Sequence, residues 1–326
     1  MSEPPQGTTR SARLLLAVLT VAALALIALY LTIGVRAGWS FTIPFRGRRV
    51  AAMVLTGVAI SASTVAFQTL AANRILTPSI LGFDALYQAI QTAAAFTLGT
   101  VGVANLGAVP TFAVSLTIML AASLALFFGL FGGARRSLHL VLLIGIVLGT
   151  MLRALTGLLQ RMLDPDTFIV LQSRLFASFS GVDPLLLKVA AGIVVAAVVA
   201  LYAMRRRLDV LALGRDTATS LGLDYRRNTL AVIALVSLLV ATATALVGPI
   251  TFFGLLVANL AYGLARTHRH AVTIPVAALL SIIVLVGGQT ILEHALGQAT
   301  VLSVVVEIAG GITFLAMLIM EGRRRV

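Results

Sequence analysis

The sequence contains no cysteine, and only 11% of its 326 residues are charged. The missing thiols exclude disulfide bonds, thiolate metal sites and cysteine nucleophiles. A soluble domain of this length would carry about a quarter charged residues, whereas 60% of this chain is hydrophobic and its mean hydropathy is +1.06. Folding alone would leave too much apolar surface in water, so the composition indicates a protein that crosses a lipid bilayer several times.

Sequence motifs typical of nucleotide-binding ATPases and of hydrolases are also missing. The nucleotide-binding pattern G-x-x-x-x-G-K-[ST] does not occur, and the single lysine, Lys188, lies in PLLLKVA. Neither H-E-x-x-H nor G-x-S-x-G is present. We therefore predict that the chain is not an enzyme and binds no cofactor. Its net charge of +13 comes from short basic runs between apolar stretches, which argues against nucleic-acid binding.

Ten apolar stretches are long enough to cross about 30 Å of hydrocarbon as helices, which takes about 20 residues each. They cover residues 12–34, 49–71, 80–100, 107–130, 138–160, 185–204, 228–247, 249–264, 271–292 and 301–320. These stretches predict an all-α polytopic membrane protein with a single transmembrane domain over residues 1–326. The first is too long for a cleaved signal peptide and is interpreted as a signal anchor behind a short tail, residues 1–11.

Two stretches begin with residues that interrupt helices. NRILTPSILGF at 73–83 places Pro78 and Gly82 at the head of the third stretch, and GPI at 248–250 precedes the short eighth stretch. We expect unwound backbone at both places, where protein or a water-filled cavity must satisfy the freed polar groups.

The distribution of basic residues predicts the orientation. One set of alternate loops holds sixteen arginines, and the other set holds seven basic residues. Because cytoplasmic loops carry the excess of Lys and Arg, the sixteen mark the cytoplasmic side, and an even number of spans puts both termini there. Four of the other seven lie between Arg36 and Arg49, against the rule, which indicates a specific use.

Few ionisable groups lie inside the spans. Asp84 shares a helix face with Gln88 and Gln91, either as a polar strip along a path or as a helix-dipole and packing feature. Arg153 and Glu307 either reach the interface or pair with each other. No array of carboxylates typical of a proton- or sodium-driven carrier is present.

The remaining polar and small residues have structural interpretations. Gly145 and Gly149 form a G-x-x-x-G predicted to allow close helix approach. The four histidines show no metal-ligand spacing, and no metal site is predicted. His268 and His270 flank Arg269 and are interpreted as headgroup-surface residues.

Residues 205–227, RRRLDVLALGRDTATSLGLDYRR, hold six arginines and three aspartates on the predicted cytoplasmic side. Within them we predict a short helix from about Asp216 to Leu221, capped by the aspartate at its start and ended by Gly222. Such a helix either docks on a soluble partner or rests on the headgroups.

Several motifs resemble those of the FecCD family, the permease subunits of ABC importers for iron–siderophore complexes, haem and vitamin B12. ALGRDTATSLGL at 212–223 is similar to a cytoplasmic stretch of that family, and VGPITFFGLLVANL at 247–260 to its GxIxFxGL segment. NRILTPSILGF at 73–83 and SFSGVDP at 178–184 resemble two further family blocks. The matches run in order across nearly the whole chain.

This resemblance implies a type II ABC importer permease of ten helices per subunit in a bacterial inner membrane. It also implies a second permease subunit, identical or related, and two cytoplasmic ATPase subunits that use ATP. The 205–227 loop would supply the helices that couple to the ATPases, through Gly214, Arg215, Asp216, Ala218, Leu221 and Gly222. Arg46 and Arg49, with Arg48 as an extra, would meet acidic side chains of an extracytoplasmic binding protein. The alternative is that these arginines anchor the chain at the headgroups.

The sequence departs from the family pattern at three places. Ala258 and Asn259 replace a common Pro-His pair, and Asn259 joins Asp84, Gln88 and Gln91 as a candidate path residue. The segment 301–314 lacks the family prolines. Where a second docking arginine can occur, this chain has Glu293 and His294. These departures are more similar to the branch for ferric catecholate-type siderophores than to the vitamin B12 branch.

The predicted function is ATP-driven import of a ferric siderophore as a permease subunit. The alternatives are the same role for haem or vitamin B12, an ion-gradient-coupled secondary transporter, and a membrane scaffold without transport.

Overall fold

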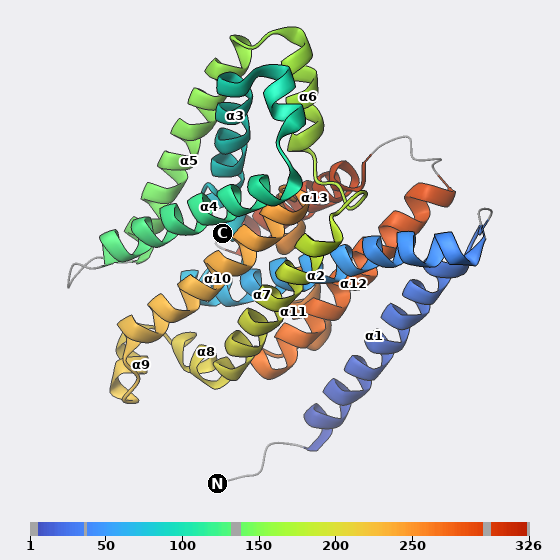
Figure 1. Ribbon diagram of the computed structural model, residues 1–326. Helices are drawn as coiled ribbons and strands as arrows, with labels where there is room; N and C mark the ends of the chain where they lie inside the picture. The colour runs from blue at the N-terminus through green and yellow to red at the C-terminus, as the bar shows by residue number, and fades with distance from the viewer. Residues whose placement is uncertain (1–5, 36–37, 132–137, 296–300, 325–326) are drawn as a thin grey trace.

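The computed structural model describes residues 6–35, 38–131, 138–295 and 301–324, and within these ranges all regular structure is helical. The helices are packed into one body, with α3 to α6 gathered at one end and α1 along one side (Figure 1). In chain order they are α1 (Gln6–Thr32), α2 (Trp39–Ala71), the 3₁₀ turn η1 (Pro78–Leu81), α3 (Phe83–Asn105), α4 (Ala108–Phe131), α5 (Leu138–Arg161), α6 (Pro165–Leu175), α7 (Pro184–Ala203), α8 (Arg205–Leu211), α9 (Arg215–Ser220), α10 (Tyr225–Val247), α11 (Phe253–Ala265), α12 (His270–His294) and α13 (Leu302–Arg324).

Each of the ten predicted spans overlaps one of the helices α1–α5, α7 and α10–α13, with bounds that differ by a few residues, and α6, α8 and α9 are additional short helices between them. Among the described residues, seven helices, α1, α2, α4, α5, α7, α10 and α12, are long and apolar enough to cross a membrane. The other three predicted spans are α3, which is broken at Gly99, the 13-residue α11, and α13. The all-α, multi-pass class is confirmed, whereas the number of ten spans and the side of both termini stay predictions.

Helix α2 forms the centre of the packing and lies against α7, α10, α11 and α12. Small residues make this possible, because a helix enclosed by neighbours needs positions where backbones can approach closely. A Cβ added to Gly57 of α2 would lie 2.8 Å from Oγ of Ser281 in α12. Gly254 of α11 is similarly pressed against Thr64 of α2.

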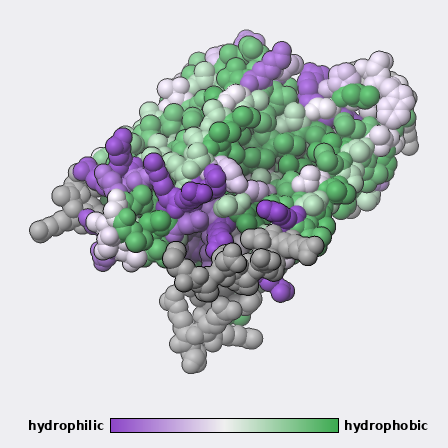
Figure 2. All heavy atoms as spheres, turned by 90° about the horizontal axis from the view of Figure 1, so that it is seen from below, coloured by the Kyte–Doolittle hydropathy of each residue, from purple (hydrophilic) through white to green (hydrophobic). Residues whose placement is uncertain are grey.

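The outer surface is largely apolar, as expected for a protein that lipid surrounds. Figure 2 shows the molecule from below the view of Figure 1, with broad hydrophobic areas and with hydrophilic residues gathered toward the ends. Helix α1 illustrates the pattern, because Leu14, Val18, Val21 and Leu24 are all more than half exposed. These side chains would be costly in water and are suited to hydrocarbon.

The two predicted interruptions are confirmed. Between α2 and α3, the turn η1 ends at Gly82, which has φ 104°. Between α10 and α11, residues 248–252 are non-helical, and Phe252 has φ 60°. The backbone N–H of Ser178 donates to the carbonyl oxygen of Val247 at 2.8 Å, so a neighbouring segment satisfies part of the second interruption.

Gly82 and Gly149 form the closest backbone approach between α5 and the start of α3. A Cβ added to Gly82 would lie 3.1 Å from the Cα of Gly149. Gly145 and Gly149 thus allow a close backbone approach, but to Gly82 at the end of the turn η1 rather than to a second helix as predicted.

Replacing Gly82 with valine should destabilise this junction. A left-handed conformation costs a side-chain-bearing residue about 1–3 kcal/mol, and the backbone of Gly149 would also have to move. We expect the thermal unfolding midpoint, measured by circular dichroism in detergent, to fall by about 5 °C or more. Gly157→Val is the control, because a Cβ at Gly157 meets no atom within 4 Å. Equal losses in the two variants would contradict this account.

Candidate functional site

The first candidate site is the 205–227 loop, which folds into α8, α9 and the start of α10. The predicted short helix is confirmed within one residue, as α9 (Arg215–Ser220). Its end follows the glycine-terminated pattern of helices: the N–H of Gly222 donates to Thr219 O at 2.9 Å, and the N–H of Leu223 donates to Ala218 O at 3.0 Å.

The predicted aspartate cap at the start of α9 is wrong. The N-cap is Gly214, with φ 90° and no side-chain hydrogen bond, and Asp216 lies inside the first turn. Gly214 leads into the helix with a positive φ, and the Asp216 side chain is exposed to solvent instead of capping the helix.

The 205–227 loop presents apolar side chains at its surface. Leu213 and Leu221, on either side of α9, are 57% and 63% exposed, whereas Ala218 between them is fully buried. Arg215 and Asp216 are exposed beside these leucines. Exposed leucines rimmed by charges on a short, anchored helix are typical of a protein-binding surface.

The loop is anchored to the helix bundle through α8. Leu208 and Leu211 are buried, and Arg207 Nη1 donates to Asn228 Oδ1 in α10 at 3.2 Å. Asp224 caps α10 by accepting from the N–H of Arg227 at 2.9 Å. Helix α9 in turn contacts both α8 and α10.

His270, at the first turn of α12, is a junction that sequence reasoning missed. Its side chain is only 3% exposed, so its interpretation as a headgroup residue is wrong. Nδ1 lies 2.6 Å from Oδ1 of Asp209 in α8, and Nε2 lies 2.7 Å from the Thr69 hydroxyl at the end of α2. The same Asp209 oxygen accepts from the His270 backbone N–H at 2.9 Å. His270 therefore ties the 205–227 loop to both α2 and α12.

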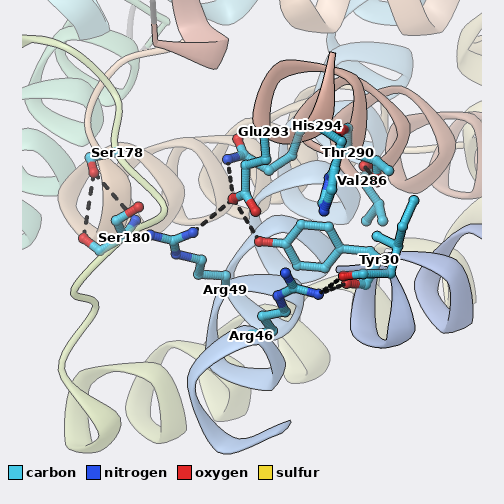
Figure 3. Close-up of polar contacts among 11 residues, drawn as sticks. Tyr30, Arg46, Arg49, Ser178, Ser180, Val286, Thr290, Glu293 and His294 are labelled. Carbon is cyan, nitrogen blue, oxygen red and sulfur yellow. Dashed lines mark hydrogen bonds and ion pairs between the residues drawn. The ribbon is translucent and has the colours of Figure 1, made fainter. Parts of the chain in front are cut away.

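The second candidate site lies at the other end of α2. Arg46 and Thr69 are separated by 23 positions of this continuous helix, which corresponds to about 35 Å. We call its residues Tyr30, Arg46, Arg49, Gln289 and Glu293 the Arg49 cluster (Figure 3). They come from α1, α2 and α12, and the cluster joins these three helices at the end predicted to be extracytoplasmic.

Glu293 is the acceptor at the centre of the Arg49 cluster. Its Oε1 accepts from Arg49 Nη1 at 2.7 Å, from the Tyr30 hydroxyl at 2.9 Å and from Gln289 Nε2 at 2.7 Å. The side chains of Arg49 and Glu293 are 14% and 7% exposed. This buried ion pair explains one departure from the family pattern, because the carboxylate at position 293 pairs with an arginine of the same chain.

The three arginines predicted to dock a binding protein differ in their surroundings. Arg46 Nη1 donates to the carbonyls of Tyr30 and Ile33 at 2.9 and 2.6 Å, which holds the end of α1. Arg49 is paired with Glu293. Arg48 is exposed and bonds only weakly to Pro44 O, at 3.2 Å through Nε. An acidic side chain of a docking protein could reach Arg48 directly. To bind Arg46 or Arg49, it would have to compete with the backbone carbonyls or the Glu293 carboxylate that these arginines already contact.

Three of the four candidate path residues, Asp84, Gln88 and Gln91, lie within two turns of α3, and the fourth, Asn259, lies on α11. Asp84 is buried and accepts from the Thr251 hydroxyl at 2.9 Å, beside the interruption between α10 and α11. Gln91 donates to Ser115 at 3.2 Å and lines a pocket of about 320 Å³. Gln88, on α3, is half-buried. Asn259, midway along α11, donates to the carbonyls of Arg74 and Leu255.

Two further ionisable groups inside the spans, Arg153 and Glu307, both lie within electrostatic range of Asp84. Arg153 is exposed and contacts Thr150 at 3.4 Å, so the alternative in which it pairs with Glu307 is not supported. In the described part of the chain no three His, Asp or Glu side chains are close enough to hold a metal ion.

Comparison with known proteins agrees with the fold and with the motif pattern. The YclO permease protein of the petrobactin import system of Bacillus subtilis (strain 168) is 42% identical over 285 residues, which cover 87% of this chain and 90% of YclO. The FatC petrobactin permease of Bacillus anthracis is 36% identical over 85% of this chain and 79% of FatC.

One solved structure has the same architecture. It is a metal-chelate type ABC transporter in an inward-facing conformation, with a TM-score of 0.81 and 21% identity over 94% of this chain and 99% of that one. The FecCD transport family matches residues 11–320. Since this match covers nearly the whole chain and the relatives are similar over most of their length, the protein belongs to the FecCD transport family.

Proposed function

We propose that the chain is a permease subunit of an ATP-driven importer for a ferric siderophore in a bacterial inner membrane. The relatives that support the cargo are petrobactin permeases, and a ferric enterobactin permease of Escherichia coli (strain K12), FepD, is 32% identical over 71% of this chain. ATP would be hydrolysed by separate subunits, because the nucleotide-binding motif is missing from the sequence. The whole chain, 1–326, would act as one permease domain.

The observation that carries the proposal is the continuous connection between the two candidate sites. An ATPase bound at Leu213 and Leu221 would displace α9 and α8, and the Asp209–His270–Thr69 contacts would pass this displacement to α2 and α12. The same two helices meet again at Arg49 and Glu293, about 30 Å away along α2. Two rigid helices that are linked at both ends are suited to transmit a movement between two states across a membrane.

At the end of α2 that holds the Arg49 cluster, we propose that a binding protein docks on Arg48. Arg46 and Arg49 would lie behind Arg48 and contribute less directly. The exposed guanidinium of Arg48 can pair with a carboxylate in two-pronged geometry, which fixes orientation as well as adding attraction. We also propose that a second permease subunit completes the path. In the single chain, helices such as α5 expose many apolar side chains that a second subunit could cover, including Leu143, Val147, Met151 and Leu155.

Reconstitution tests the proposed function. We expect ferric siderophore uptake into liposomes only when permease, ATPase, binding protein and ATP are all present, and its loss when any one is omitted. The isolated chain under a proton or sodium gradient serves as the control, and uptake by that chain without ATP would identify a secondary transporter instead. Uptake of haem or vitamin B12 in place of the siderophore would reassign the cargo.

A further inference from the structure

A small recessed pocket of about 150 Å³ lies beside Arg49. Its polar lining is the Arg49 guanidinium, the Gln289 amide and the hydroxyls of Ser178 and Ser180, and buried apolar side chains such as Phe179 close it. The pocket is large enough for several waters. It can hold a small charged group and its stem, but not a whole metal chelate.

The guanidinium of Arg49 is only partly used by its ion pair. Nη1 donates to Glu293, whereas Nε is buried without a hydrogen-bond partner. Figure 3 shows the guanidinium between the Glu293 carboxylate and the segment with Ser178 and Ser180. Because Nε is enclosed by protein atoms, a ligand in the pocket would contact the remaining N–H groups of the guanidinium rather than Nε.

The charge around the pocket favours an anion. Arg49 lines the pocket, and Arg46, three positions earlier on α2, brings a second guanidinium close by, whereas Glu293 brings one carboxylate. Arg46 is held by backbone carbonyls, which do not cancel its charge. An anion in the pocket would therefore reduce an excess of positive charge.

The shape of the donors favours a carboxylate. The flat edge of a guanidinium matches the two oxygens of a carboxylate, and serine hydroxyls can donate to the same oxygens. The Ser178 hydroxyl is engaged only by long contacts with Ser180, at 3.3 and 3.4 Å, and can turn toward a stronger acceptor.

We propose that this pocket binds a carboxylate group of the transported chelate. The cargo assignment rests on the proposed function, whereas carboxylate binding follows from the pocket itself. Because the Arg49 side chain is only 14% exposed, a flexible arm of a small molecule reaches it more readily than a side chain of a docked protein. Ser178 and Ser180 also line the neighbouring pocket of about 320 Å³, which has room for further parts of the chelate.

Thermal unfolding of the full-length protein in lipid nanodiscs tests carboxylate binding without transport. Acetate should raise the unfolding midpoint in a saturable manner, and chloride at the same ionic strength and pH should not. Ser178→Ala with Ser180→Ala should weaken the apparent acetate affinity about tenfold, whereas Arg161→Gln, which removes an exposed positive charge at the end of α5, should leave it unchanged. An absent acetate effect, or equal affinity in the double serine variant, would overturn the proposal.

Uptake by the complete reconstituted importer tests the source of the carboxylate. A ferric chelate with a free carboxylate should be taken up about tenfold faster at low concentration than its methyl ester, and the double serine variant should lose this preference. Equal uptake of acid and ester by the unaltered protein would overturn the cargo assignment. So would a double variant that keeps the preference but binds the binding protein more weakly, since the carboxylate would then come from that protein.

Discussion

Replacing Glu293 with alanine should destabilise the protein by about 3–5 kcal/mol, because it leaves the Arg49 guanidinium buried without its counter-charge. The Tyr30 hydroxyl and the Gln289 amide lose the same acceptor. The expected result is a lower midpoint of thermal unfolding, with the ends of α1, α2 and α12 released from one another. Denaturant unfolding in detergent, followed by circular dichroism, measures the loss.

A double variant separates charge from packing at this site. Arg49→Met combined with Glu293→Leu removes both charges and keeps apolar volume, and such replacements of a buried pair are often neutral. We therefore expect it to be more stable than Glu293→Ala alone. If the double variant were as unstable as the single one, the ion pair would not explain the loss.

Replacing Leu221 with arginine should uncouple transport from ATP hydrolysis while the protein still folds and inserts. Leu221 is 63% exposed at the end of α9, so the fold does not depend on its burial. Central apolar residues of a protein interface contribute about 2 kcal/mol or more, which corresponds to about a 30-fold weaker coupling contact. Uptake and ATPase activity of the reconstituted importer measure the effect.

Leu185→Arg is the matched control for this substitution. Leu185 is 57% exposed at the start of α7, away from the 205–227 loop. We expect Leu185→Arg to retain uptake, and we expect Leu221→Arg to retain expression and thermal stability. Normal uptake by Leu221→Arg would refute the coupling role of α9.

Local signals in the sequence predicted the parts of the fold that neighbouring residues determine. Apolar run length located the helices, and Pro78 and Gly82 marked an interruption that the structure contains. Gly222 correctly predicted the end of α9, because a left-handed residue after a helix is a local requirement. Its start was predicted wrongly, since a glycine N-cap has no side chain by which to recognise it.

Contacts between distant segments could not be predicted in this way. Arg49 and Glu293 are 244 positions apart, and His270 and Asp209 are 61 apart. Periodicity places a residue on a helix, but only the packing of α2 against α12 and of α8 against both decides which polar groups meet. Glu293 could be noticed as a departure from a family pattern, whereas nothing local in the sequence distinguishes His270 from its exposed neighbour His268.

The uninterrupted course of α2 restricts how this protein can vary. Each added or deleted residue turns the remainder of an α-helix by about 100° and shifts it by about 1.5 Å. One such change between the segments that hold Thr69 and Arg49 would point one of them away from its partner. Helix α2 can therefore vary in its side chains more readily than in its length, because the number of residues between Arg49 and Thr69 decides whether both contacts can form.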